Sequence, residues 1–276
     1  MAEILLGTSV SGRAGAAARE APAQASLAAL SVAGIASCVN LAFHDDAPPA
    51  SPLQTLPMLR LDARVVSGVE GARKPVVTEM LDILAAEADR RGIQRIGIVN
   101  GDIVVTAAAI DAAVATPRGA LAMARTDTGG GLPESLLRHG IDMFTFDAGF
   151  WQRHRRCFRA YLLGEPVWDN VYAAIVACHG GEIVNREGLL LHARHPPAFN
   201  ASPYARYIQL LAARDSAYFS LWCEYVARAE ALAAHRALSG ADTALQRQIF
   251  RAPGFAADAA GIARATWWRA RQALGA

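Results

Sequence analysis

Short apolar runs alternate with amphipathic segments through the first 125 residues. Apolar runs bounded by small polar residues or glycine predict strands at residues 3–10, 35–43, 63–71, 95–105 and 119–126. Leucine and alanine at helical spacing predict helices at residues 19–34, 74–92 and 106–117, the last with Thr106 as its N-cap. This alternation predicts an α/β fold with a mostly parallel, doubly wound sheet, in which ligands bind at the carboxyl ends of strands.

The second half of the chain changes character. A glycine-rich loop at 129–140 precedes an alternating aromatic strand at 141–151, and helices are expected at 153–166 and 167–181. Residues 182–197 are typical of a hairpin whose last strand ends in two histidines, and the chain from Ser202 onward is mostly helical in pattern. We therefore expect a domain over residues 1–200, divided into halves 1–125 and 126–200, and a helical C-terminal extension over 201–276.

Composition narrows the classes of protein. The 276 residues carry a formal net charge of +2, too balanced for nucleic acid as the main partner. The four cysteines form no CxxC pair, which argues against a zinc site or a disulfide framework and fits a reducing cytoplasm. The N-terminus lacks a basic region of the secretory type. The uncharged stretch 23–43 could span a bilayer in length, but its polar residues and Gly34 favour a helix followed by a strand.

The predicted strand 95–105 is interrupted by the tripeptide Asn100-Gly101-Asp102. A carboxylate on a short turn after a buried strand can hold a divalent cation, which in turn neutralises a diphosphate. Gly101 would let the backbone approach the phosphates closely. The alternative is an ordinary tight turn, because Asn-Gly and Gly-Asp are common turn dipeptides.

Other polar residues follow predicted strands or open predicted helices. His192 and His195 lie at the end of an apolar run, where an imidazole can bind a metal or can simply be exposed in a loop. Asp169 lies near a predicted helix start and is either an N-cap or a general base, with Glu165 as the second candidate for the base.

The segment 7–15 resembles a phosphate-binding loop without matching one. Arg13 and Ala14 replace the lysine and the hydroxyl residue of the P-loop, and the GxGxxG spacing of a dinucleotide fold is absent. Thr8 and Ser9 could still contact a nucleotide, and the alternative is an ordinary connection between strand and helix.

The order of these segments resembles that of a glycosyltransferase of the GT-A fold, a class that uses nucleotide-diphosphate sugars. The resemblance covers roughly residues 3–200 and depends on the strand "VNGDIVV", the strand "GIDMFTF", the segment "GEPVWDN" and the strand end "HARH". It implies a cytoplasmic enzyme of surface-polysaccharide or glycoconjugate synthesis, with a nucleotide-diphosphate sugar as donor and a carbohydrate or glycolipid as acceptor.

The resemblance also implies roles for individual residues. The aspartate-any-aspartate motif of the family falls on Asn100-Gly101-Asp102, so that Asp102 would bind Mn²⁺ or Mg²⁺ although the first acidic residue is missing. His192, or else His195, would complete the metal site. Asp169 would be the base of an inverting reaction. The remaining expected roles are nucleotide-sugar binding by Thr8, Ser9, Arg73, Lys74, Asn100 and Gly101, and acceptor binding by Asp142, Trp151 and Trp168, of which Trp151 could equally be a core residue.

Two rival functions remain open. A sugar-1-phosphate nucleotidylyltransferase has a similar sheet but needs a GxGTR-type loop, which "GTSVSGR" matches poorly. A non-catalytic binding or assembly module is compatible with the missing carboxylate. The C-terminal segment "RATWWRARQAL" would suit contact with the inner membrane surface or a partner, against the alternative of a tryptophan-rich helix packed on its own domain.

Overall fold

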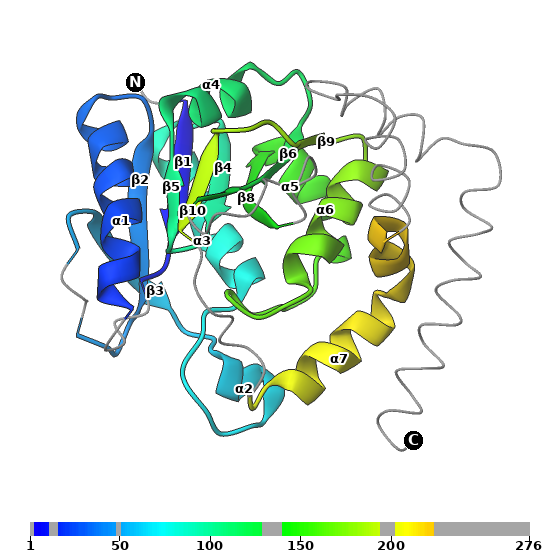
Figure 1. Cartoon of the computed structure of the whole chain (residues 1–276). Coiled ribbons are helices and arrows are strands. Elements are labelled where there is room, and N and C mark those ends of the chain that lie inside the picture. The colour runs from blue at the N-terminus through cyan, green and yellow to red at the C-terminus, as the bar shows by residue number, and fades with distance from the viewer. Residues whose placement is uncertain (1–2, 11–15, 48–50, 129–139, 194–201, 224–276) are drawn as a thin grey trace.

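The computed structural model describes residues 3–10, 16–47, 51–128, 140–193 and 202–223. Within them, a seven-stranded sheet has the order β3-β2-β1-β4-β8-β6-β9 (Figure 1). Its strands are β1 (Ile4–Thr8), β2 (Ser37–Phe43), β3 (Gln54–Leu59), β4 (Arg95–Val99), β6 (Ala120–Ala124), β8 (Ile141–Asp147) and β9 (Glu182–Val184).

The sheet is mostly parallel, and its strand order reverses between β1 and β4. From β1 the chain moves outward to β2 and β3, and then returns to form β4 on the other side of β1. β8 is antiparallel to both of its neighbours, β4 and β6. Ligands of open α/β sheets bind beyond the carboxyl ends of the strands at such a switch point, here between β1 and β4.

A second, three-stranded sheet has the order β5-β10-β7. It joins β5 (Ile103–Val105), β7 (Thr126–Thr128) and β10 (Leu190–Ala193). β5 and β7 come shortly after β4 and β6, so this small sheet lies at the carboxyl edge of the main sheet. Its register pairs His192 with Ile103 on one side and with Asp127 on the other.

Helices cover both faces of the main sheet, and each face has its own apolar core. Helices α3 (Val77–Arg91), α5 (Ala148–His154), α6 (Trp168–Cys178) and α7 (Ala205–Arg214) contribute to one core. Helices α1 (Ala17–Val32) and α4 (Ala107–Ala115) contribute to the other. Successive side chains of a strand point to opposite faces of the sheet. In β1, Leu5 therefore packs in the first core, while Ile4 and Leu6 pack in the second. The doubly wound arrangement is therefore confirmed.

Several local predictions are confirmed. Thr106 caps α4 by accepting a hydrogen bond from the Ala109 N–H at 3.3 Å. The run 95–105 divides into β4 and β5 at the Asn100-Gly101-Asp102 turn, and these two strands belong to different sheets. α7 and the helical residues 216–223 agree with a helical pattern after Ser202. Residues 224–276, with the tryptophan pair, lie outside the described residues.

The predicted strand at 63–71 is wrong, because residues 63–67 form the short helix α2 (Ala63–Ser67). Asp62 caps this helix by accepting hydrogen bonds from the N–H groups of Arg64 and Val65, and Gly68 ends it in the left-handed conformation. The β-branched pair Val65-Val66 favoured a strand, and the two caps override that preference.

The predicted hairpin at 182–197 is also wrong, because β9 pairs with β6 in the main sheet while β10 joins the small sheet. The predicted helix at 153–166 is largely absent. Its first residues end α5 and form the 3₁₀ turn η1 (Arg155–Cys157). Residues 161–163 instead run beside the start of α3, where Val77 donates to the Tyr161 carbonyl and Leu163 donates to the Pro75 carbonyl.

Candidate functional site

The carboxyl ends of β1 and β4 meet at the switch point of the sheet. Thr8, the last residue of β1, is buried, and its hydroxyl has no hydrogen-bond partner within the described structure. Gly101 lies against the next residue, because a Cβ at Gly101 would be 3.1 Å from the Ser9 carbonyl oxygen. The absence of a side chain therefore lets the Asn100-Gly101-Asp102 turn pack against Ser9, and a buried hydroxyl without a partner is a group that a ligand can satisfy.

His192 lies between two carboxylates. Its Nε2 faces Asp102 Oδ2 at 3.6 Å, and its Nδ1 lies 2.7 Å from Asp127 Oδ1. The His192 side chain is 8% exposed, whereas Asp102 is 31% exposed. The turn after β4 and the strand β10 are thus brought together, as the resemblance implied, while Asp127 was not anticipated.

Asn100 begins a second series of contacts, which leads through Asp142 and Arg125 to Asp127. Its side-chain amide donates to Asp142 Oδ1, and its backbone N–H donates to the Asp142 carbonyl at 3.2 Å. Arg125 Nη1 donates to Asp142 Oδ2 at 3.1 Å, and Arg125 Nε donates to Asp127 Oδ1 at 2.9 Å. Together with the contacts of His192, this series forms a closed ring that begins at Asn100 and ends at Asp102. We call it the polar ring, and its members are Asn100, Asp102, Arg125, Asp127, Asp142 and His192.

The polar ring contains charges of both signs. Three carboxylates stand against one guanidinium, Arg125, and a histidine. Burial lowers the pKa of His192, but the hydrogen bonds and charges of Asp102 and Asp127 outweigh this effect and raise the pKa overall. Burial raises the pKa of Asp142, although Arg125 and Asn100 oppose the shift.

Asp169 lies in the first turn of α6 and is half-buried. Burial and the negative charge of Asp142 raise the pKa of Asp169 to about 7. Asp142 also interacts electrostatically with Asp102. A carboxyl group with a pKa near neutrality can accept a proton at the pH of a cell, as a general base must.

The backbone before Asp169 is strained. Val167, which precedes α6, has φ +81°, a conformation that a β-branched residue rarely adopts. The neighbouring Trp168 is buried against Phe144, with ring centroids 5.2 Å apart. Strain of this kind is concentrated at functional sites, where the surrounding packing maintains it.

A divalent cation fits part of this arrangement. Two ligand atoms that share one ion at ~2.1 Å each lie ~3.0–3.4 Å apart, so Asp102 Oδ2 and His192 Nε2 at 3.6 Å need a small shift. In the described part of the chain, no three His, Cys, Asp or Glu side chains are grouped so as to hold a metal ion. Mg²⁺ commonly takes one or two protein ligands and completes its shell with phosphates and water. The residues therefore fit a cation whose remaining positions are filled by water or by the oxygens of a phosphorylated ligand.

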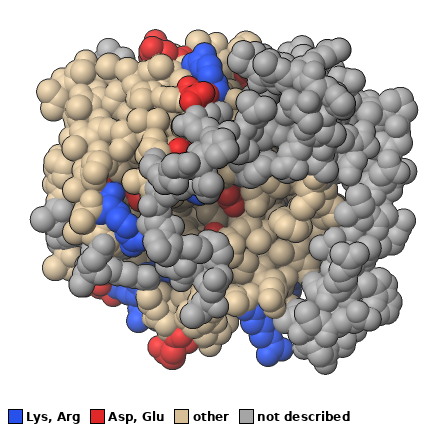
Figure 2. Space-filling model, in the orientation of Figure 1, with Lys and Arg blue, Asp and Glu red and all other residues tan. Residues whose placement is uncertain are grey.

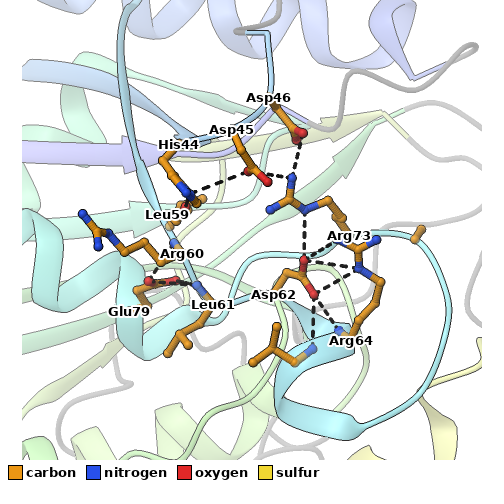
Figure 3. A network of polar contacts seen from close by, with 12 residues as sticks. His44, Asp45, Asp46, Leu59, Arg60, Leu61, Asp62, Arg64, Arg73 and Glu79 are labelled. Atoms are coloured by element: carbon orange, nitrogen blue, oxygen red, sulfur yellow. Dashed lines mark hydrogen bonds and ion pairs between the residues drawn. The ribbon is translucent and has the colours of Figure 1, made fainter.

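Arg73, one of the residues expected to bind the diphosphate, is surrounded by carboxylates instead (Figure 3). Its Nη1 donates to Asp45 and Asp46 at 2.8 and 2.7 Å, and its Nε donates to Asp62 at 2.9 Å. Its guanidinium also lies 4.0 Å from the ring centre of Phe43. We call Arg73, Asp45, Asp46, Asp62 and Arg64 the Arg73 network.

Lys74 and Glu165 were predicted for different roles, and the structure pairs them. Lys74 Nζ lies 2.5 Å from Glu165 Oε1, which also accepts a hydrogen bond from Ser202 at 2.7 Å. The Glu165 side chain is 1% exposed. This pair ties the segment before α6 to the segment before α3, and it leaves Asp169 as the better placed candidate for the base.

The three expected acceptor contacts lie in the interior. Trp151 is 3% exposed and donates its indole N–H to Asp82 at 3.1 Å, which agrees with the alternative that it is a core residue. Trp168 is 2% exposed and Asp142 is 3% exposed. His195 lies outside the described residues.

Figure 2 shows one face of the molecule, on which uncharged side chains predominate and acidic side chains are visible near the middle.

Sequence reasoning missed Arg125 and Asp127. Both follow β6 directly in the segment "ARTDT", where two charged residues interrupt an otherwise apolar and small stretch. Charged residues just beyond a buried parallel strand were the available signal, and the same signal had pointed to Asp102 after β4.

Comparison with known proteins identifies no family. No protein-family model matches the sequence, and neither does any curated protein. Among solved structures, the chain is similar to the crystal structure of mannose-1-phosphate geranyltransferase from Thermus thermophilus, with 14% sequence identity and a TM-score of 0.31. The similarity covers 56% of this chain and 60% of that protein, so the chain spans less than two thirds of its length. A similarity this weak supports no argument about activity.

None of the helices in the described residues combines the length and the apolar character needed to cross a bilayer.

Proposed function

We propose that this chain is a glycosyltransferase that uses a nucleotide-diphosphate sugar together with Mn²⁺ or Mg²⁺. One observation carries the proposal: Asp102 and His192 meet at the switch point of an α/β sheet, and Asp142 links them electrostatically to Asp169, a carboxyl with a pKa of about 7. A cation position and a proton acceptor are both needed for transfer of a sugar to a hydroxyl group.

Asp102 and His192 would hold the cation, and Thr8, Ser9 and Gly101 would face the nucleotide. When bound, the cation would supply the positive charge that stabilises the departing nucleoside diphosphate.

Asp169 would take the proton from the acceptor hydroxyl, a contribution of ~10²–10⁴-fold to the rate. Asp142 supports this role through its charge, which helps to keep the pKa of Asp169 near 7. Trp168 and the strained Val167 fix the start of α6, so the carboxylate is held in place before the acceptor binds.

Thermal unfolding in the presence of nucleotides tests the proposal. We would measure Tm with UDP, GDP, CMP, dTDP and their sugars, each with and without Mn²⁺ or Mg²⁺. A ligand at 100 times its Kd stabilises by about 2.7 kcal/mol, which raises Tm by ~5–10 °C in a chain of this size. We expect one nucleotide class to give such a shift, and only when the cation is present.

Two variants make the test specific. Asp102→Ala should lose the cation-dependent shift. Asp111→Ala removes an exposed carboxylate on α4 and should keep it. A panel without any shift would contradict the proposal and favour a non-catalytic module.

The assay of products separates the two enzymatic alternatives. A glycosyltransferase releases a nucleoside diphosphate or monophosphate from the sugar nucleotide. A sugar-1-phosphate nucleotidylyltransferase instead consumes a nucleoside triphosphate and releases pyrophosphate. Pyrophosphate release from a triphosphate and a sugar 1-phosphate would therefore replace the proposed reaction by the nucleotidyl transfer.

Synthesis of surface polysaccharide or glycoconjugates by a cytoplasmic enzyme, with a carbohydrate or glycolipid acceptor, is the setting in which we place this activity. The nucleotide panel identifies the donor class first, and acceptor sugars can then be tested with that donor.

A further inference from the structure

Arg125 and Asp127 belong to the polar ring but have no part in the proposed mechanism. Both follow β6, and Asp127 is the register partner of His192 between β7 and β10. Their contacts determine how the imidazole of His192 is oriented.

The contact between Asp127 and His192 selects one form of the histidine. Asp127 Oδ1 lies 2.7 Å from Nδ1, and an ionised carboxylate can only accept hydrogen bonds. Nδ1 must therefore carry a proton. In the neutral ring the lone pair is then on Nε2, the nitrogen that faces Asp102. A carboxylate behind a metal-binding histidine has this effect on the tautomer in general.

Arg125 holds Asp127 and Asp142 at the same time. Its Nε donates to Asp127 Oδ1 at 2.9 Å and its Nη1 donates to Asp142 Oδ2 at 3.1 Å. The guanidinium is a rigid plane with several donors, so one side chain fixes two carboxylates from different strands. A lysine has a single nitrogen and cannot keep both contacts in this geometry.

Gly140 keeps the guanidinium in place. The Arg125 N–H donates to the Gly140 carbonyl at 3.0 Å. A Cβ at Gly140 would be 2.9 Å from the central carbon of the guanidinium and 3.0 Å from its Nε. The backbone at Gly140 thus packs directly on Arg125, and any side chain there would displace it.

We propose that Arg125 and Asp127 are positioning residues of the cation site, with Arg125 fixing Asp127 and Asp127 fixing His192 so that Nε2 faces Asp102. The inference rests on the proposed function, because the site it serves is the cation site of the transferase. It adds two residues that sequence reasoning did not identify, and it accounts for the glycine at position 140.

Mn²⁺ binding measures the effect on the site directly. We would titrate the full chain with Mn²⁺ and follow the free ion by electron paramagnetic resonance, without nucleotide. Loss of a group behind a metal ligand weakens affinity by about 10- to 100-fold, so we expect this loss for Asp127→Asn and about tenfold for Arg125→Lys. Gly140→Ala should weaken binding in the same direction while retaining the arginine.

Arg155→Lys is the matched control. Arg155 also binds a carboxylate through two nitrogens, with Nε at 2.8 Å and Nη2 at 2.7 Å from the oxygens of Asp82. It follows α5, at the other end of β8 from Asp142. It should bind Mn²⁺ as the wild type does.

The tautomer of His192 provides a second measurement, which a general loss of stability would not change. Long-range ¹H–¹⁵N NMR at a pH where the ring is neutral should show the proton on Nδ1 in the wild type, and on Nε2 in part of the molecules of Asp127→Asn. A wild-type ring protonated on Nε2, or unchanged Mn²⁺ affinity in all three variants, would overturn the inference. Mn²⁺ binding without any nucleotide binding would overturn the proposed function alone, whereas a wild type that binds no Mn²⁺ would overturn both.

Discussion

The polar ring and the Arg73 network lie at the same edge of the main sheet, and each holds an arginine between carboxylates. Their buried aspartates differ. Asp62 accepts hydrogen bonds from two backbone N–H groups and from the side chains of Arg64 and Arg73 (Figure 3). Asp142 accepts from the side chains of Asn100 and Arg125.

This difference changes the pKa of the two groups in opposite directions. The hydrogen bonds from Arg64, with those from Val65 and Arg73, lower the pKa of Asp62 to about 2 in spite of burial. Burial raises the pKa of Asp142 in spite of Arg125 and Asn100. A carboxylate whose lone pairs are all used stabilises the fold, whereas one with few donors perturbs its neighbours. From this comparison we expect the Arg73 network to serve the stability of the fold, and we propose ligand chemistry for the polar ring alone.

The largest effect is expected at Asp169, the group that Asp142 perturbs. Asp169→Asn keeps the shape of the side chain but cannot accept the proton, so transfer should slow by ~10²–10⁴-fold. The cation-dependent Tm shift with nucleotide should remain. Initial rates of sugar transfer, measured beside the thermal shift, check both. Equal rates in wild type and variant would assign the base elsewhere, and Glu165→Gln would then be the next variant.

The Arg73 network should show the opposite pattern. Asp62→Ala removes the N-cap of α2 and leaves Arg73 without its most buried partner, and breaking a buried pair costs ~3–5 kcal/mol. We expect a loss of about 3 kcal/mol in the free energy of unfolding, measured with urea. Nucleotide binding by the remaining folded protein should be unchanged. A weaker nucleotide affinity of the folded Asp62→Ala protein would contradict this expectation and would include the Arg73 network in the ligand site.

The same contrast predicts a pH dependence of stability. The pKa of Asp169 is raised from 3.8 to about 7, so its stabilising proton is present below pH ~4 and is lost as the pH rises to ~7. The pKa of Asp62 is lowered to about 2, so its contribution is lost as the pH falls from ~4 toward 2.

Asp169→Asn should therefore gain stability over the wild type between pH 4 and 7. We expect about 2 kcal/mol at pH 8, roughly half of the full value for such a pKa shift because the side chain is partly exposed. Both proteins should lose stability alike below pH 4, because Asp62 is intact in both. Urea unfolding across this range measures the difference, and parallel curves from pH 4 to 8 would contradict the raised pKa.

The fold was predictable where its signals were local. The apolar alternation and the N-cap Thr106 predicted β1, β2, α1, α3 and α4, and Asp102 was proposed as a ligand because it follows a buried strand. Asp127 was missed because its importance arises from the pairing of β7 with β10, whose partners are 65 positions apart. The hairpin at 182–197 failed for the same reason, since the sequence shows a turn between two strands but not the sheet that each one joins.

Arg73 and Lys74 show a different limit. Each is a basic residue near a helix start, which is a sound reason to expect phosphate binding. Their ion-pair partners are the carboxylates of residues 45, 46, 62 and 165. No local pattern in the sequence connects those positions with 73 and 74. The charge of a side chain can be read from the sequence, whereas its partners depend on the tertiary structure.

The smallest expected effect concerns the backbone conformation beside the Arg73 network and beside Asp169. Beside the Arg73 network, Gly68 has the left-handed conformation, with φ +68° and ψ 17°, whereas before Asp169 the residue with positive φ is Val167, with φ +81° and ψ −34°. A side chain held at positive φ costs about 1–2 kcal/mol, and the flexibility of glycine in the unfolded chain offsets roughly 0.5–1 kcal/mol of any gain.

Val167→Gly should therefore raise the free energy of unfolding by about 0.5–1 kcal/mol, while Gly68→Val should lower it by about 1–2 kcal/mol. The first variant should also slow sugar transfer, because a glycine before α6 no longer fixes Asp169. Urea unfolding and transfer rates measured on both variants test this. A Val167→Gly protein that is less stable than the wild type would show that contacts of the valine side chain, and not the position of Asp169, account for the strained backbone.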